Sequence, residues 1–497
     1  MSSAIKKVVV VGRDADAWIT ALFLKQAFLS SSQLVDVCLV ELSSDLAFHD
    51  FYSVLPGHQF LHKILGANEL VLLNRAKGLY SFGHRYSNWS GNKPPFMLAY
   101  DRYGADFKGI DFWQYWLKAL AHGLQVPLED FSLGAVAAKA GRYVTSGSLD
   151  DDFSEVSYGY NLDAISYIKS IAKIAIKTGV RHSSGPLQDV EVEDDIIKCI
   201  SLANGQKIEA DFFIDASGTD AALIRHLEQD NQESWSKYFL CDQQLLSSAR
   251  VLTPHPAFTQ ISAFNNGWAG IYPLKDNTRV AISYSSRFAE SSEILDRVSI
   301  MTGLKLEAPI LTTHSYGVRK KHWLGNCLAI GNTAVSVDIL DSAHLHFLQV
   351  GLSLLRNLFP NSKNFVSEAK LYNDKLTKHV QGVRDYQLAH YYLNKRYGES
   401  FWDLQRSIEL PESLRSRLDL FQQRGMIALI EEDVFQGSDW AGLFIGHGVI
   451  PKYYNPLVHQ IPDAELMVKF QQILAHIHKE VTRIPTLESQ IEINLSN

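Results

Sequence analysis

The stretch Val8-Val-Val-Val-Gly12-Arg-Asp-Ala-Asp-Ala17-Trp18 decides the fold of this chain. Its four consecutive valines are typical of a strand that is covered on both faces, and Gly12 ends that strand. Apolar residues then recur at the spacing of an amphipathic helix. A second apolar strand runs from Val35 to Val40 and ends on Glu41. Because such strand–helix–strand units cross over right-handed, we expect the two strands to be parallel neighbours.

A hairpin is expected further along the chain, around Asn204-Gly205. Residues 190–200 and 208–214 are strand-like on either side of this dipeptide. Asn-Gly is typical of tight hairpin turns in which both central residues take positive φ. The second strand ends in Asp215-Ala-Ser-Gly218, which we interpret as a turn that leaves the sheet.

A third apolar strand, Cys327 to Ile330, ends at Gly331-Asn332 and precedes a helix expected over residues 341–358. Three separate segments therefore supply strand ends that can meet at one edge of a parallel sheet. In α/β proteins, dinucleotides bind at this edge, beyond the carboxyl ends of the strands. Residues 240–290 are β-rich in pattern and the chain from 364 onward is mostly helical, which predicts interleaved subdomains.

The composition indicates an ordinary globular protein of 497 residues, with 46% hydrophobic and 20% charged residues. The net charge of −7, without a large basic cluster, argues against a nucleic-acid or membrane-surface role. We find no apolar run near the ~20 residues of a membrane span and no secretory signal. The cysteines are scattered without a CxxC pair, so we expect neither a disulfide framework nor a zinc site. These features predict a cytoplasmic protein without a metal.

Five phrases, in the same order along the chain, resemble the flavin-dependent tryptophan halogenase family. They are the opening strand and turn with Trp18, the segment Ala76–Trp89, the phrase Asp211–Gly218, the stretch from Asn326 through Leu340-Asp341-Ser342 to His346, and the signature between Arg384 and Trp402. The resemblance implies an α/β flavoprotein fold with a Rossmann-like FAD-binding sheet, an interleaved β-rich substrate layer and a helical C-terminal subdomain.

On this basis we expect a discontinuous FAD-binding core over residues 1–45, 150–230 and 325–360. The catalytic and substrate region would comprise 46–149 and 231–324, and the helical subdomain 361–497. Family chemistry uses reduced FAD and oxygen to oxidise halide, a lysine to relay the oxidant to an aromatic substrate, and a nearby glutamate. A separate flavin reductase is implied, because we find no second nucleotide-binding unit. The sequence leaves homo- or hetero-oligomerisation open.

The resemblance places the FAD diphosphate at the turn after the first strand, where the family has GxGxxG. Here the second glycine is Asp14 and the third is Ala17. Asp14 adds a negative charge, and two like charges ~4 Å apart repel by about 1 kcal/mol in water and by more when shielded from it. Arg13 can offset this repulsion. The alternative is that Asp14 or Asp16 caps the helix.

The other cofactor-binding positions follow from the same comparison. Glu41 lies where a carboxylate could hold the ribose, although a solvated strand-end carboxylate is an equal alternative. In the segment Phe51–Pro56, Tyr52 takes a family glutamate position, while Ser53 and Pro56 match. The expected cofactor-binding residues are Gly12, Arg13, Ala15, Glu41, Asp215, Gly218, Gly331 and Asn332.

The catalytic positions differ most from the family. Ser81 stands at the lysine position, and a serine hydroxyl can neither form a haloamine nor donate a cationic hydrogen bond. Lys77 is a poor substitute because four strand residues separate it from that position by about 13 Å. Asp341 stands at the glutamate position, one methylene shorter and followed by Ser342.

The substrate region of the family carries WxWxIP, which appears here as Trp268-Ala-Gly-Ile-Tyr-Pro273. Trp268 and Pro273 remain and are expected at the substrate pocket, whereas Gly270 replaces the second tryptophan. The alternative for Trp268 is a core aromatic.

Two functions remain open from the sequence. The first is a halogenase-family protein that no longer halogenates and serves as an accessory or binding paralogue. The second is an active FAD-dependent oxidoreductase, either an aromatic monooxygenase or a halogenase, acting on an indole- or phenol-like substrate with externally reduced flavin.

Overall fold

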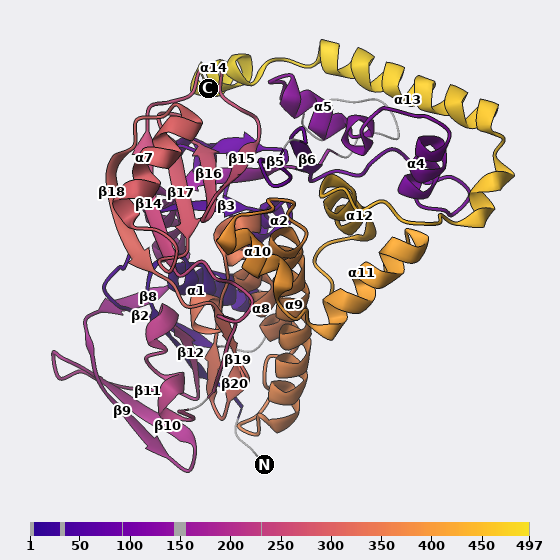
Figure 1. The fold of residues 1–497 in the computed structure, drawn as a ribbon. Helices are drawn as coiled ribbons and strands as arrows, with labels where there is room; N and C mark the ends of the chain where they lie inside the picture. Colours follow the sequence, from indigo (N-terminus) through magenta and orange to yellow (C-terminus); the bar gives the residue numbers. More distant parts are fainter. Residues whose placement is uncertain (1–3, 30–34, 92, 144–155, 230, 497) are drawn as a thin grey trace. The chain divides into compact units, whose positions relative to one another are not determined.

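The computed structural model describes residues 4–29, 35–91, 93–143, 156–229 and 231–496. It is a mixed α/β fold with a parallel sheet, as predicted (Figure 1). The chain forms two compact units, each made of three segments. Unit 1 comprises residues 1–78, 162–236 and 315–381, and unit 2 comprises 79–161, 237–314 and 382–497. The expected domain boundary at residue 150 lies outside the described residues.

The central sheet of unit 1 has the strand order β20-β21-β12-β1-β2-β8. Its strands are β1 (Lys7–Gly12), β2 (Asp36–Glu41), β8 (Arg181–Ser184), β12 (Phe212–Ala216), β20 (Trp323–Leu324) and β21 (Cys327–Ala329). The opening unit forms as predicted, because β1 is followed by α1 (Asp14–Leu29) and pairs in parallel with β2, with Gly12 opposite Glu41. β12 and β21 extend the parallel sheet on the other side of β1.

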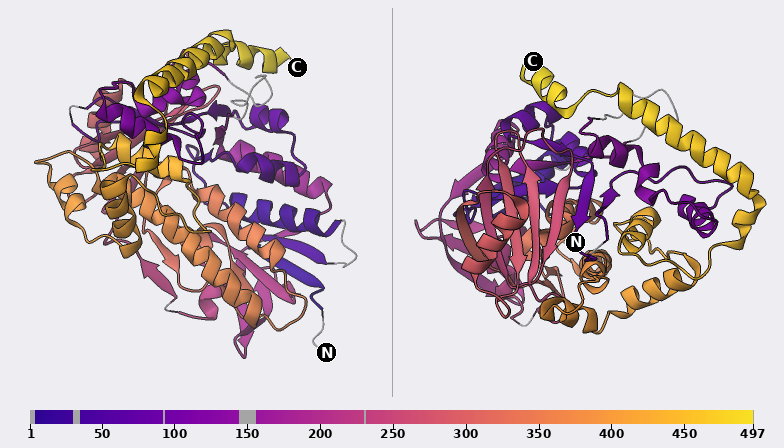
Figure 2. Two further views of the ribbon diagram at one scale, coloured as in Figure 1. Left: turned by 90° about the vertical axis from the view of Figure 1, so that its right-hand side faces the viewer. Right: turned by 45° about the horizontal axis from the view of Figure 1, so that its top comes forward.

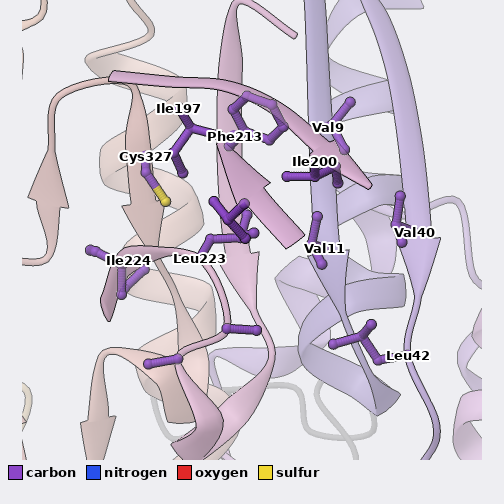
Figure 3. Close-up of a cluster of buried hydrophobic side chains, with 14 of the residues drawn as sticks. Val9, Val11, Val40, Leu42, Ile197, Ile200, Phe213, Leu223, Ile224 and Cys327 are labelled. Carbon is purple, nitrogen blue, oxygen red and sulfur yellow. The ribbon is translucent and has the colours of Figure 1, made fainter. Parts of the chain in front are cut away.

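The valine run of β1 is buried on both faces, which explains its continuous hydrophobicity. Val9 and Val11 pack with Phe213 of β12 beneath the hairpin of β9 (Leu187–Glu193) and β10 (Ile196–Leu202), as Figure 3 shows. Fully burying each such side chain contributes about 1.5–3 kcal/mol. This packing fixes the position of the turn at Gly12, where β1 ends.

The expected strand over 190–200 is wrong, because the structure splits it into β9 and β10. Asp194 and Asp195, between them, both take positive φ, 50° and 57°, so the tight turn with two left-handed residues lies here. A second hairpin does form around Asn204-Gly205, joining β10 to β11 (Lys207–Glu209), but there only Gly205 has positive φ. The aspartates accept this conformation because their short polar side chains tolerate it.

The remaining elements of unit 1 lie around these sheets. They are β3 (Phe51–Val54), α2 (His58–Ile64), α3 (Glu69–Arg75), α6 (Ala164–Lys177), η2 (Gly218–Asp220), η3 (Ile224–His226), β13 (Gln232–Ser234), β19 (Gly317–Arg319), η4 (Gly331–Thr333), β22 (Val335–Ser336), η5 (Ile339–Asp341) and α8 (His344–Asn357). The helix α9 (Val366–Tyr392) begins in unit 1 and ends in unit 2. The helix expected from residue 341 starts at His344 instead, because Ser342 takes a left-handed φ of 58°.

Unit 2 contains a seven-stranded sheet of order β18-β14-β17-β16-β15-β5-β6, which confirms the β-rich pattern of residues 240–290. Its strands are β5 (Gly83–Ser87), β6 (Phe96–Ala99), β14 (Gln243–Ala249), β15 (Thr259–Phe264), β16 (Gly267–Pro273), β17 (Thr278–Tyr284) and β18 (Glu307–Thr313). The helix α7 (Ser291–Thr302) packs Ile294 and Val298 on this sheet. A separate short pairing joins β4 (Leu79–Ser81) to β7 (Gly159–Asp163).

The C-terminal part of unit 2 is helical, as expected. Its elements are α10 (Ser400–Ser407), α11 (Glu412–Arg424), α12 (Gly437–Gly446), η6 (Pro456–Gln460), α13 (Asp463–Arg483) and α14 (Leu487–Ser496). Figure 2 shows α13, in yellow, running alongside α5 (Leu133–Lys139) and α4 (Phe112–Ala121), which η1 (Leu128–Phe131) connects. Phe470 of α13 packs against Phe131, with ring centroids 4.9 Å apart. No helix in the described ranges is long and apolar enough to span a membrane.

Candidate functional site

The carboxyl ends of β1, β12 and β21 meet at one edge of the parallel sheet, as the sequence predicted. Gly12 lies opposite Ala216, and Asp215 lies opposite Ala329. The backbones approach so closely that a Cβ at Gly12 would lie 2.2 Å from the carbonyl oxygen of Ala216. Glycine is therefore required at position 12 for packing within the sheet.

Asp14 takes a backbone conformation that suits glycine better than other residues. Its φ is +55°, in the left-handed region that favours glycine and tolerates aspartate. One carboxylate oxygen accepts a hydrogen bond from the Ser44 hydroxyl at 2.5 Å, and the other accepts one from the Asp45 amide at 3.3 Å. Burial raises the pKa of Asp14, while Ser44 and Arg13 act in the opposite direction. The side chain thus links the β1–α1 turn to the loop after β2.

Arg13 is already paired with two carboxylates. Its guanidinium forms ion pairs with Asp45 and with Asp220, the latter at 2.7 Å. Its charge is therefore balanced within the chain and cannot also offset the charge of an incoming anion.

Asp16 is 6% exposed and reaches across to the turn after β21. Its Oδ2 accepts a hydrogen bond from the Asn332 amide at 2.8 Å, and its Oδ1 lies 3.6 Å from Nε2 of His344. Gly331 has a φ of +59°, and a Cβ there would lie 2.2 Å from the Asp16 carboxyl carbon. Burial raises the pKa of Asp16, and His344 lowers it. The hydrogen bonds of Asp14 and Asp16 go to other loops, so neither side chain caps the first turn of α1.

Asp215 is fully buried and its carboxylate is satisfied within the turn that it begins. It accepts hydrogen bonds from the Ser217 amide and hydroxyl and from the amides of Leu223 and Ile224, over 2.5–3.1 Å. Gly218 has a φ of +75° and donates its amide to the Thr333 hydroxyl at 2.8 Å. Asp215 therefore shapes this edge of the sheet rather than facing a ligand.

Glu41 ends β2, and its Oε1 accepts a hydrogen bond from the Trp18 indole at 2.9 Å. The carboxylate is half-buried rather than fully solvated. Ala15 is buried in the first turn of α1. Of the expected cofactor residues, the structure places Gly12, Arg13 and Ala15 on the β1–α1 turn. Glu41 ends β2 and Asp215 lies near the end of β12. Gly218 begins η2, and Gly331 and Asn332 lie in η4, directly after β12 and β21.

Asp341 ends η5 and Ser342 directly follows it, and both are buried. The Ser342 hydroxyl is 2.7 Å from that of Ser53 in β3, which ties the position after Asp341 to the Tyr52 segment. The Tyr52 ring stacks on the imidazole of His344, with centroids 5.8 Å apart.

Ser81 lies at the end of β4 in unit 2 and is 1% exposed. Its hydroxyl donates to the Gly83 carbonyl at 3.1 Å. The side chain is thus short and buried, and its hydroxyl is hydrogen-bonded within the connection between β4 and β5.

Trp268 and Pro273 both lie on β16. Trp268 is fully buried and donates its indole N–H to the Tyr391 hydroxyl at 2.8 Å, so it has the environment of a core aromatic. A Cβ at Gly270 would lie 2.5 Å from the ring of Tyr272. Tyr272 therefore fills the space that a side chain at position 270 would need.

A histidine cluster in unit 1 was missed by the sequence reasoning. His58 and His62 of α2 both place Nε2 on the Tyr167 hydroxyl, at 3.1 and 2.9 Å. His346 and His379 meet through their Nε2 atoms at 2.9 Å. The spacing of four between His58 and His62 was the available signal, because such residues share a helix face. No group of three metal-ligating side chains was found among the described residues.

The fold and the glycine-lined strand ends define an α/β protein of the dinucleotide-binding class. The family model described as tryptophan halogenase matches residues 7–463, and the chain belongs to that family.

Known relatives agree over nearly the full length. Tryptophan 7-halogenase RebH of Lentzea aerocolonigenes is 24% identical over 506 residues, covering 93% of each chain. BrvH, a flavin-dependent halogenase from Brevundimonas sp. BAL3, is 26% identical with a TM-score of 0.93, covering 98% of this chain and 99% of that one. Xcc4156, a flavin-dependent halogenase from Xanthomonas campestris, is 24% identical with a TM-score of 0.92, covering 99% of both chains, and shares the fold.

Membership of this flavin-dependent family implies FAD, an aromatic substrate and a separate flavin reductase. The residues at the β1–α1 turn do not fit a diphosphate well. The carboxylates of Asp14 and Asp16 already occupy donors around this turn, and Asp45 and Asp220 already neutralise Arg13. Two further negative charges would be repelled there.

Proposed function

We propose that this chain is a member of the tryptophan halogenase family that does not halogenate and acts as an accessory or binding paralogue. The observation that carries the proposal is Ser81, a buried serine at the position of the family lysine. Its hydroxyl is engaged with the Gly83 carbonyl and carries no positive charge. It can neither form a haloamine nor donate a cationic hydrogen bond to an oxidant.

The β1–α1 turn supports the same proposal from the cofactor side. Asp14 has the backbone shape of the family glycine but adds a carboxylate, and Asp16 holds the Asn332 amide. A flavin diphosphate would have to displace or protonate these groups. We therefore expect weak FAD affinity rather than the tight binding that a flavoenzyme needs.

Two further positions at which the family has functional residues also differ in this chain. Asp341 is one methylene shorter than the family glutamate and is buried. Gly270 replaces a tryptophan, and the Tyr272 ring occupies the adjacent space. No observation specifically favours the alternative of an aromatic monooxygenase.

The test is a halogenation assay on the purified full chain. The reaction contains FAD, a flavin reductase with NADH, oxygen, bromide and either indole or phenol, and mass spectrometry detects brominated product. We expect no bromination above a control without the protein. Steady bromination by the wild-type chain, lost when Asp341 is changed to Asn, would overturn the proposal. Formation of a hydroxylated product coupled to oxygen uptake would instead establish the monooxygenase.

A further inference from the structure

A pocket in unit 1 lies beside the three-stranded sheet β13-β19-β22. It has a volume of about 200 Å³ and is lined from η2, β13, β19, η4 and β22. A pocket of this size suits a small molecule.

The pocket contains a buried arginine whose charged end is open. Arg319 lines the pocket but is only 4% exposed. Its Nε donates to the Thr333 carbonyl at 2.8 Å, which anchors the guanidinium. Within the described residues, Nη1 and Nη2 have no hydrogen-bond partner, and neither is among the atoms sealed from solvent. Because the rest of the residue is covered, these two nitrogens face the pocket.

Among the residues that the structure describes, no carboxylate accepts a hydrogen bond from Nη1 or Nη2 of Arg319. Burial lowers the pKa of Arg319, and the charge of Asp215 opposes that effect from nearby. The Asp215 carboxylate, however, is engaged by Ser217 and by the amides of Leu223 and Ile224. Water in the pocket can reach these two nitrogens, and an external carboxylate that accepts two parallel hydrogen bonds from them would replace that water with a charge-assisted pair.

The charges that line the pocket limit what can bind. Glu233 also lines it, and its Oε1 accepts a hydrogen bond from the Trp235 indole at 3.1 Å. Arg319 can balance one negative charge, whereas a dianion such as phosphate would leave an excess beside Glu233. Glu233 can in turn pair with an ammonium group on the same ligand.

We propose that the pocket around Arg319 binds a small monocarboxylate, either a simple carboxylate or a small α-amino acid, through a two-pronged hydrogen bond from the Arg319 fork. The proposal does not rest on the proposed loss of halogenation, although Asn332, one of the expected cofactor-binding residues, also lines the pocket. It gives the chain a small-molecule binding activity of its own.

The experiment is calorimetric titration of the full chain with sodium acetate and with glycine, at constant ionic strength and with sodium chloride alone as the blank. We expect saturable binding of at least one of the two probes. Arg319→Lys keeps the charge but loses the planar fork, and we expect at least tenfold weaker binding. Thr219→Glu places a carboxylate on the exposed rim of the pocket and should abolish binding without disturbing the core.

The matched control is Lys321→Gln, which removes a nearby exposed cation that pairs with Glu228 outside the pocket lining. Its affinity should stay within twofold of wild type. The proposal is overturned if neither probe binds beyond the chloride blank, or if Thr219→Glu binds as tightly as wild type in a chain with unchanged circular dichroism. It is equally overturned if Lys321→Gln weakens binding as much as Arg319→Lys.

Discussion

The carboxylate of Asp16 accepts a hydrogen bond from the backbone amide of Asn332 at 2.8 Å, across 316 residues of sequence. The bond joins the first turn of α1 to the turn after β21, the two loops between which a dinucleotide would lie in this class of fold. We expect this negative charge to lie where the family binds the diphosphate of its cofactor.

The first concerns Asp14. Asp14→Gly removes a carboxylate and restores the residue best suited to a φ of +55°. We expect FAD affinity to rise by about fivefold or more, since one like-charge repulsion at ~4 Å is worth about 1 kcal/mol even in water. Fluorescence titration with FAD measures the change. Asp194→Gly is the matched control, because Asp194 also has positive φ but lies in the β9–β10 turn. Equal affinities for wild type and Asp14→Gly would contradict the electrostatic argument.

The second concerns the stability provided by Asp16. Asp16→Ala removes the acceptor of the Asn332 amide and the partner of His344. The partly buried amide then loses a hydrogen bond to a charged acceptor, so the free energy of unfolding should fall by about 1–3 kcal/mol. Urea denaturation at neutral pH measures this quantity. An unchanged midpoint would mean that water or another group satisfies Asn332 equally well.

The third concerns the histidine cluster and pH. Burial lowers the pKa of His62 to about 4, so the folded chain keeps His62 neutral while the unfolded chain protonates it below about pH 6.5. The unfolded state binds more protons in this window, so stability falls as the pH decreases from 6.5 toward 4. At pH 5, His62 alone should cost about 2 kcal/mol relative to pH 8.

The measurement is urea denaturation of wild type and of His62→Gln at pH 8 and pH 5. Glutamine can still hydrogen-bond to Tyr167 but does not titrate. The variant should lose less stability between the two pH values than wild type does. An identical loss in both proteins would exclude His62 as a source of the pH dependence.

The fourth concerns the packing at Gly270. Gly270→Ala places a Cβ about as close as 2.5 Å to the Tyr272 ring, and we expect a loss of about 1–3 kcal/mol from overpacking. Thermal denaturation monitored by circular dichroism measures the loss. Combining it with Tyr272→Ala should show strong non-additivity, because the second substitution removes the clashing ring. Additive effects would indicate that the backbone shifts instead.

The opening βαβ unit could be predicted from the sequence, because the valine run of β1 and the helical spacing of apolar residues after it are strong local signals. It also correctly placed Gly12, Gly218 and Gly331 at the ends of parallel strands. It missed the turn at Asp194-Asp195, because two aspartates are a less common choice for left-handed positions than Asn-Gly. Here the turn forms because aspartate tolerates a left-handed φ, and no glycine is needed.

The side-chain partners could not be read from the sequence. Tyr167 lies 105 residues from His62, and Asp16 reaches Asn332 only after β21 is placed beside β12. The sequence around Arg319 gives no indication of a binding site. Whether its two terminal nitrogens reach a pocket depends on which strands cover the rest of the side chain. These contacts depend on tertiary packing, which periodicity and spacing do not determine.

The measurement that tests the central claim most directly is FAD titration of the wild-type chain, followed by flavin fluorescence. Because we expect Asp14 and Asp16 to occupy the position of the diphosphate, we predict no saturable binding at FAD concentrations that saturate an active family member. Tight, stoichiometric binding by the unmodified chain would contradict it.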